Sequence, residues 1–152
     1  MPILFTPGQL MAALSLSKQQ WRTYRQALSP LSTTEGRSGC FTAGDLLATA
    51  VIQYATDTLH MSVSALSPVA DALYDVCGSH PWIPLERGCV ALILDDGRAI
   101  LLDEDQRPPV CKLAVLIELR PLVLELRDRL LAAGRDPQQE LAFPPMFAGG
   151  RS

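Results

Sequence analysis

The residues best suited to chemistry lie on one short polar and basic segment early in the chain. Ser17 and Gln20 have the S-x-x-Q spacing of a capping box, in which each side chain satisfies a backbone N–H at a helix start. The helix that this start predicts carries basic and amide side chains, namely Lys18, Gln19, Gln20, Arg22 and Arg25. Lysine and glutamine can reach base edges in a DNA groove, while arginine neutralises phosphates. The segment therefore favours recognition of DNA; a plain solvated helix face is the alternative.

A polar stretch follows Ser29-Pro30, which we expect to stop this helix. A second contact to the DNA backbone or minor groove is one interpretation of this stretch, and a plain surface loop is the other. Trp21 and Tyr24 are interpreted as core anchors rather than as stacking platforms for bases, although Tyr24 also stays among the candidate contacts. The full candidate DNA-contacting set is Ser17, Lys18, Gln19, Gln20, Arg22, Tyr24, Arg25, Arg37 and Ser38.

Charge is distributed unevenly along the 152 residues, whose net charge is −3. Residues 1–40 carry four basic side chains against one acidic, and residues 41–110 carry three against ten. Residues 111–152 carry six basic side chains against five acidic. The positive field is therefore concentrated at the N-terminal end, which is where a polyanion would bind.

Composition also bears on compartment and class. No run of 18 apolar residues lacks a charge, and the first residues lack the basic start of a secretory signal, so we expect a cytoplasmic chain without a membrane span. The four cysteines lack a CxxC pair, which suits a reduced compartment. Zinc bound by Cys77, His80, Cys89 and Cys111 is a weaker interpretation, because this spacing fits no standard motif. No catalytic triad or nucleotide loop appears, so we expect no metal, no cofactor and no enzyme.

Helix signals cover the first half of the chain. Thr6-Pro7-Gly8-Gln9 is a second capping box, and its helix is expected to run to about Leu14, which two residues separate from Ser17. Two short helices joined by so tight a turn predict a helix-turn-helix. A strongly apolar helix is expected to start at Thr42-Ala43-Gly44-Asp45 and to run to about Leu59. One or two more are expected between Ser62 and Cys77, closed by Gly78.

The pattern changes period after a predicted loop at residues 78–88. Cys89–Leu94 and Ala99–Leu102 are expected to form a hairpin through a two-residue Asp-Gly turn. Val110–Leu119 is interpreted as a buried strand, with a helix as the alternative. A last helix is expected to begin at Pro121 and to end at Ala133-Gly134.

The order of signals from Phe5 to about Cys77 resembles the winged-helix DNA-binding domain of the MerR family. The matching motifs are Phe5-Thr6-x-x-Gln9-Leu10, Gln20-Trp21-Arg22, Leu28-x-Pro30-Leu31, Gly36-Arg37, Phe41-Thr42, Asp45-Leu46-Leu47 and Ser62-Val63-x-x-Leu66. The resemblance implies a recognition helix, a two-stranded wing and a closing helix pair. Gln20 stands where the family usually has arginine, and the long coiled-coil helix of the family is absent. The family's effector sensing is therefore not implied.

Together these signals predict an α+β chain: a winged helix-turn-helix DNA-binding domain over residues 1–78, an α/β dimerisation module over 79–134 and a flexible tail over 135–152. Residues 89–133 are too apolar to be left exposed, so we expect a homodimer through them; packing onto residues 41–77 as one core is the alternative. The predicted function is a bacterial sequence-specific transcriptional regulator that binds double-stranded DNA. The rival is a protein-binding adaptor or anti-regulator, and a small-molecule sensor is a weaker third.

Overall fold

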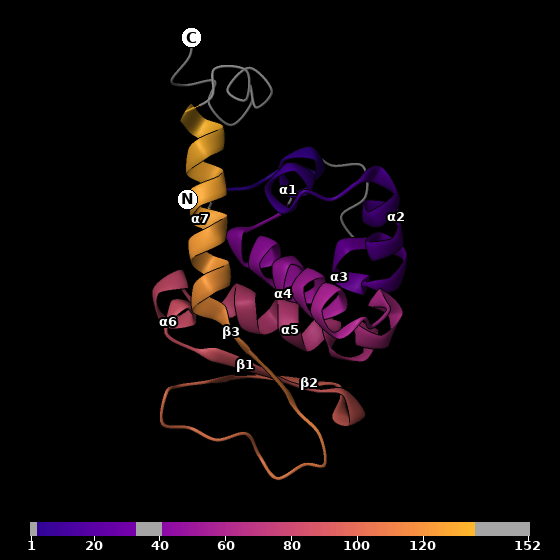
Figure 1. The fold of residues 1–152 in the computed structure, drawn as a ribbon, viewed down its shortest axis with the longest axis vertical. Coiled ribbons are helices and arrows are strands. Elements are labelled where there is room, and N and C mark those ends of the chain that lie inside the picture. The colour runs from indigo at the N-terminus through magenta and orange to yellow at the C-terminus, as the bar shows by residue number, and fades with distance from the viewer. Residues whose placement is uncertain (1–2, 33–40, 136–152) are drawn as a thin grey trace.

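The computed structural model describes residues 3–32 and 41–135, which form a mixed fold of helices and one small sheet (Figure 1). In chain order the elements are α1 (Pro7–Leu14), α2 (Lys18–Ala27), α3 (Ser29–Ser32), α4 (Ala43–Leu59), the 3-10 helix η1 (Val63–Leu66), α5 (Ser67–Ser79), α6 (Trp82–Glu86), β1 (Cys89–Ile93), the 3-10 helix η2 (Leu94–Asp96), β2 (Arg98–Leu102), β3 (Val115–Glu118) and α7 (Leu119–Arg135). The expected α+β class is confirmed. The tail predicted from residue 135 falls, from residue 136 on, outside the described residues.

Local hydrogen bonds set the starts of α1, α2 and α4. The hydroxyls of Thr6, Ser17 and Thr42 each accept the backbone N–H three residues on at 3.1 Å. The side chain at that third position accepts the capping residue's own N–H at 2.8–2.9 Å. These reciprocal bonds satisfy donors that a helix start otherwise leaves unpaired, and they confirm the predicted starts.

Several helix boundaries differ from those predicted, because glycine and proline are tolerated in the first or last turn of a helix. The predicted stop of α2 before Ser29-Pro30 is confirmed, but the same two residues also open the short helix α3, because proline is compatible with a first turn. Gly78 lies inside α5, and α6 occupies part of the predicted loop at 78–88. The last helix begins at Leu119, with Pro121 in its first turn, and continues through Gly134 to Arg135.

The sheet is antiparallel, in the order β2-β1-β3, with Ala91 opposite Ile100 on one side and Leu116 on the other. The predicted hairpin is confirmed, but its connection has four residues, 94–97, instead of two, and closes on Gly97 with φ 64°. Only residues 115–118 of the run Val110–Leu119 form a strand.

Strands β2 and β3 are both antiparallel to β1, so residues 103–114 must cross the sheet between them. Val90, Leu92 and Ile117 lie on the sheet face that joins the main core with α5. Ala91 and Ile93 alternate to the other face and are also buried. Figure 1 shows segment 103–114 on the side of the sheet away from the helices.

One hydrophobic core joins the early helices to the later sheet and α7, including Leu46 and Leu73 as well as Val90 and Leu126. The boundary at residue 78 stays a prediction, and the core contains residues from both sides of it. Helices α4 and α5 meet closely at Gly44, where an added Cβ would lie 2.5 Å from the Cys77 carbonyl oxygen. None of the helices in the described ranges has the length and apolar character needed to cross a membrane.

Candidate nucleic-acid interface

The inner face of α2 is anchored by aromatic packing. Trp21 and Tyr24, three residues apart on one helix face, are buried, as is Leu28 just beyond the helix. The Trp21 ring meets Phe41 edge to face, with centroids 5.7 Å apart and planes at 84°. Phe41 in turn exchanges backbone hydrogen bonds with Phe5 at 2.6 and 3.0 Å. The orientation of α2 is therefore fixed by residues from three separated parts of the chain.

The outer face of α2 is cationic and carries no acidic side chain. Lys18, Gln19 and Arg22 are exposed, and neither Lys18 nor Arg22 forms an ion pair within the described residues. Arg25 is half-buried, with its guanidinium carbon 6.0 Å from the centroid of the Trp21 ring, a cation–π distance. Among residues 3–32 and 41–135, therefore, no carboxylate competes with an anion for Lys18 or Arg22.

An open hollow of about 620 Å³ lies on this face. Its lining consists of Lys18, Trp21, Arg22, Arg25, Gln26 and Ser32. Gln26 and Ser32 are not among the contacts predicted from the sequence. Helical spacing could have indicated Gln26, because it follows Arg22 by four positions and Lys18 by eight.

The candidate contacts divide into several groups. Ser17 and Gln20 use side-chain oxygens in the capping box, so they position α2 while Lys18, Gln19 and Arg22 project outward. The prediction of Tyr24 as a DNA contact is wrong, because its side chain is buried and offers no ring face to DNA. Burial also raises the pKa of its phenol, and the residue anchors the core. Arg37 and Ser38 lie outside the described residues.

The turn before α2 is tight and locally strained. Ser15 takes the left-handed conformation at φ 54°, and Leu16 donates its N–H to the Met11 carbonyl at 2.9 Å. This 6→1 bond is the signature of a Schellman helix end, a position where glycine is the usual residue. Leu16 is buried, so the turn is held to the core.

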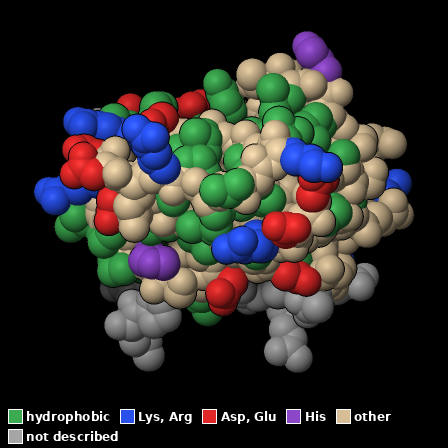
Figure 2. All heavy atoms as spheres, turned by 90° about the horizontal axis from the view of Figure 1, so that it is seen from below, with side chains coloured by type: hydrophobic (Ala, Val, Ile, Leu, Met, Phe, Trp, Pro, Cys, Tyr) green, Lys and Arg blue, Asp and Glu red, His purple; other side chains and the backbone are tan. Residues whose placement is uncertain are grey.

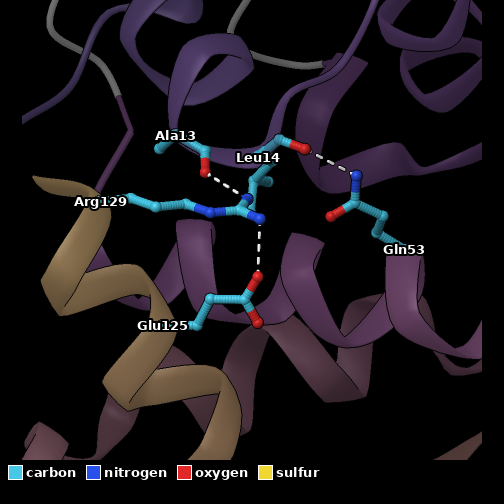
Figure 3. Close-up of polar contacts among 5 residues, drawn as sticks. All are labelled: Ala13, Leu14, Gln53, Glu125 and Arg129. Carbon is cyan, nitrogen blue, oxygen red and sulfur yellow. Dashed lines mark hydrogen bonds and ion pairs between the residues drawn. The ribbon is translucent and has the colours of Figure 1, made fainter.

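Two distant side chains bind the free carbonyls at the end of α1 (Figure 3). Arg129 from α7 donates through Nη1 to the Ala13 carbonyl at 2.8 Å and through Nη2 to Glu125 at 2.6 Å. Gln53 from α4 donates through Nε2 to the Leu14 carbonyl at 2.7 Å. A cation is favoured at a helix C-terminus, so α7 helps to position the turn that leads into α2.

The residues considered for zinc do not form a cluster. Cys77 is buried, Cys89 half-buried and Cys111 exposed, and His80 Nδ1 lies 2.9 Å from the Val76 carbonyl. Among residues 3–32 and 41–135, no three His, Cys, Asp or Glu side chains are placed to hold a metal ion.

Comparison with known proteins identifies no matching family model, no similar curated protein and no similar solved structure. The resemblance to the MerR family therefore rests on the motifs of this sequence alone.

Proposed function

We propose that this protein is a sequence-specific DNA-binding transcriptional regulator that acts as a homodimer. In this proposal α1, its turn and α2 form a winged helix-turn-helix, with residues 33–40 as the wing. One observation carries the proposal: α2 is anchored by the buried Trp21 and Tyr24 on one side and exposes Lys18 and Arg22 on the other, where neither forms an ion pair with another residue of the described ranges. A recognition helix needs this division, because its inner face must be rigid while its outer face enters the major groove.

The roles follow from position along α2. Residues near the start of a recognition helix contact base edges, which assigns Lys18 and Gln19 to sequence readout. Arg22 lies one turn further on and, with Arg25, would neutralise phosphates. Arg37 and Ser38 would contact the DNA backbone or minor groove from the wing. The MerR-like motifs, taken as a resemblance, support the same assignment.

A binding titration over a range of salt concentrations tests the proposal. With about four to eight phosphate contacts per dimer, log affinity should fall with log salt at a slope of roughly −4 to −7. Arg22→Ala should weaken binding to all sequences alike and make the slope shallower, whereas Gln19→Ala should relax the preference at one base pair. Arg87→Ala is the matched control, because it removes an exposed arginine far along the chain from α2. It should change neither the affinity and its salt slope nor the base preference.

Binding that is absent, or that does not respond to salt, would refute the proposal. The second candidate is an adaptor or anti-regulator that uses the same helix to bind an acidic protein partner. The excess of acidic residues in 41–110 favours it, because this charge repels a DNA backbone nearby. Arg22→Ala would then abolish capture of the partner protein while genomic DNA fragments fail to bind the wild-type chain.

A further inference from the structure

Strand β3 is an edge strand whose outer side is open. It pairs only with β1 in the three-stranded sheet. Apart from that ladder, the backbone hydrogen bonds found in the described parts of the chain give residues 113–118 no partner. The opposite edge, β2, has α5 packed against it. An open edge offers a row of unpaired N–H and C=O groups to any extended chain that approaches it.

The segment that leads into β3 lacks the usual protection of an edge. Residues 110–118 contain no proline and one lysine, and Val110, Leu113 and Leu116 are more than half exposed. Figure 2, which views the molecule from the side of the sheet, shows apolar side chains gathered across the middle of this face with charges of both signs around them. Proteins usually block such an edge, so an apolar and unblocked one indicates a partner strand.

The charges on this segment are complementary to those of a second copy of itself. In an antiparallel pair centred on Val115, Lys112 faces Glu118 of the second copy, and Glu118 faces its Lys112. Leu113 then faces Ile117, and Ala114 faces Leu116. Lys112 and Glu118 are both exposed, and Lys112 lies at a bend just before β3. If residues 112–114 become extended on pairing, the even spacing places the two charged side chains on the same face of the sheet. Opposite charges directly across a ladder stabilise the pairing, and like charges oppose it.

We propose that β3 pairs with β3 of a second copy in this register, so that two three-stranded sheets join into one of six strands. The inference deepens the proposed function, since it names the surface through which the regulator forms its homodimer. In this register residues 112–114, which precede β3, become extended and lengthen the strand. Figure 1 shows α2 on the far side of the helices from the sheet, so this pairing leaves the cationic face of α2 free.

The mass of the full-length chain in solution, measured over a range of concentrations, tests the pairing. Lys112→Glu and Glu118→Lys each convert both cross-strand pairs into like charges, so each variant alone should dimerise about tenfold more weakly or worse. An equal mixture of the two variants should recover the dimer, because every cross-strand pair is then opposite in charge. Arg107→Glu and Glu104→Lys make the same charge changes at exposed positions outside the register and should leave dimerisation unchanged.

Amide hydrogen exchange supplies a second readout, with residues 113–118 expected to gain protection as the dimer forms. A chain that stays monomeric at about 100 µM would overturn the inference. A dimer that both single variants preserve would overturn it as well. If no dimer forms while salt-dependent DNA binding is present, this inference alone fails; if the mixture recovers the dimer but no DNA binds, the proposed function fails.

Discussion

Ser15 occupies a backbone conformation that ordinarily belongs to glycine. Its φ of 54° ends α1 and starts the turn toward α2. A side chain in this region raises the energy of the folded state, while glycine adopts it freely. The turn is held in place by the Leu16 backbone bond and by Leu16 burial, so the strain at Ser15 is tolerated.

Ser15→Gly should stabilise the protein by about 0.5–1 kcal/mol, because it removes the strain at the left-handed position. Urea unfolding at equilibrium measures the change. Arg22→Gly is the matched control: it introduces the same residue at an exposed position in the interior of α2 and should cost about 1 kcal/mol. A destabilising Ser15→Gly would mean that the serine side chain stabilises the turn.

Tyr74 and Thr49 form a buried pair between α5 and α4, with their oxygens 2.6 Å apart. The Thr49 hydroxyl also donates to the Asp45 carbonyl at 2.7 Å, so the Tyr74 hydroxyl donates to Thr49. Burial raises the pKa of Tyr74 above its ordinary value of 10.0, and burial likewise raises the pKa of Cys77 to about 12. Both groups release a proton more readily in the unfolded chain than in the folded one. Their contribution to the free energy of unfolding is therefore fully present below their ordinary pKa values and is lost as pH rises above them.

Tyr74→Phe should cost about 1 kcal/mol at neutral pH, because one buried hydrogen bond is lost. The loss of stability above the ordinary tyrosine pKa should be shallower in this variant than in the wild type. The remaining loss comes from Cys77, Tyr24 and Cys89, whose pKa values burial also raises. Urea midpoints across the alkaline range measure both effects. Tyr54→Phe removes the hydroxyl of an exposed tyrosine and should cost less than about 0.5 kcal/mol at neutral pH. Identical alkaline profiles for Tyr74→Phe and wild type would contradict the prediction.

At the scale of elements, α7 controls how α1 ends. Arg129 reaches the Ala13 carbonyl across 116 positions of sequence, and Glu125 one turn earlier on α7 holds its guanidinium in place. Gln53 makes the parallel bond from α4 to Leu14. The last helix of the chain is thus tied directly to the turn that sets the direction of α2.

Arg129→Ala should destabilise the protein by about 1–2 kcal/mol, because a half-buried charged hydrogen bond to a helix carbonyl is lost. If α2 reads DNA, the variant should also bind all sequences more weakly without a change in salt slope, since no phosphate contact is removed. Urea unfolding and salt-dependent titration are the two measurements. Arg127→Ala removes an arginine of the same helix from a half-exposed pair with Glu86 and should cost less than about 1 kcal/mol. Equal losses for both variants would argue against a special role for Arg129.

At the scale of the whole molecule, the shared core couples the early helices to the later sheet. Leu73 of α5 and Val90 of β1 belong to the same buried cluster as Leu10 of α1. The apolar segment 89–133, which suggested a partner chain, thus buries much of its surface within its own chain. What remains exposed around β3 is the part left for a second copy.

The described chain should therefore unfold in a single transition. Trp82→Phe leaves Trp21 as the only tryptophan and reports on α2, while Trp21→Phe leaves Trp82 as the reporter of α6. Trp82→Phe should cost little, because the Trp82 indole N–H is buried without a hydrogen-bond partner. In each variant the urea midpoint from fluorescence should coincide with that from far-ultraviolet circular dichroism. Separate midpoints would indicate two independent units with a boundary near residue 78.

The sequence by itself determined the features that depend on neighbours within about four residues. The capping boxes at Thr6 and Ser17 could be read directly, because each involves one turn of helix. The basic face of α2 could be read in the same way. Helix ends were less certain, since glycine and proline are tolerated within a first or last turn, as Pro121 and Gly134 show.

Only the tertiary structure decided which distant groups meet. The hydrogen bond from Arg129 to Ala13, the sheet order β2-β1-β3 and the burial that removes Tyr24 from the interface all join segments far apart in sequence. Such contacts depend on how whole faces pack against one another, and no local pattern specifies that packing. The open edge of β3 is likewise a property of the assembled sheet, because a strand becomes an edge only when its neighbours are placed.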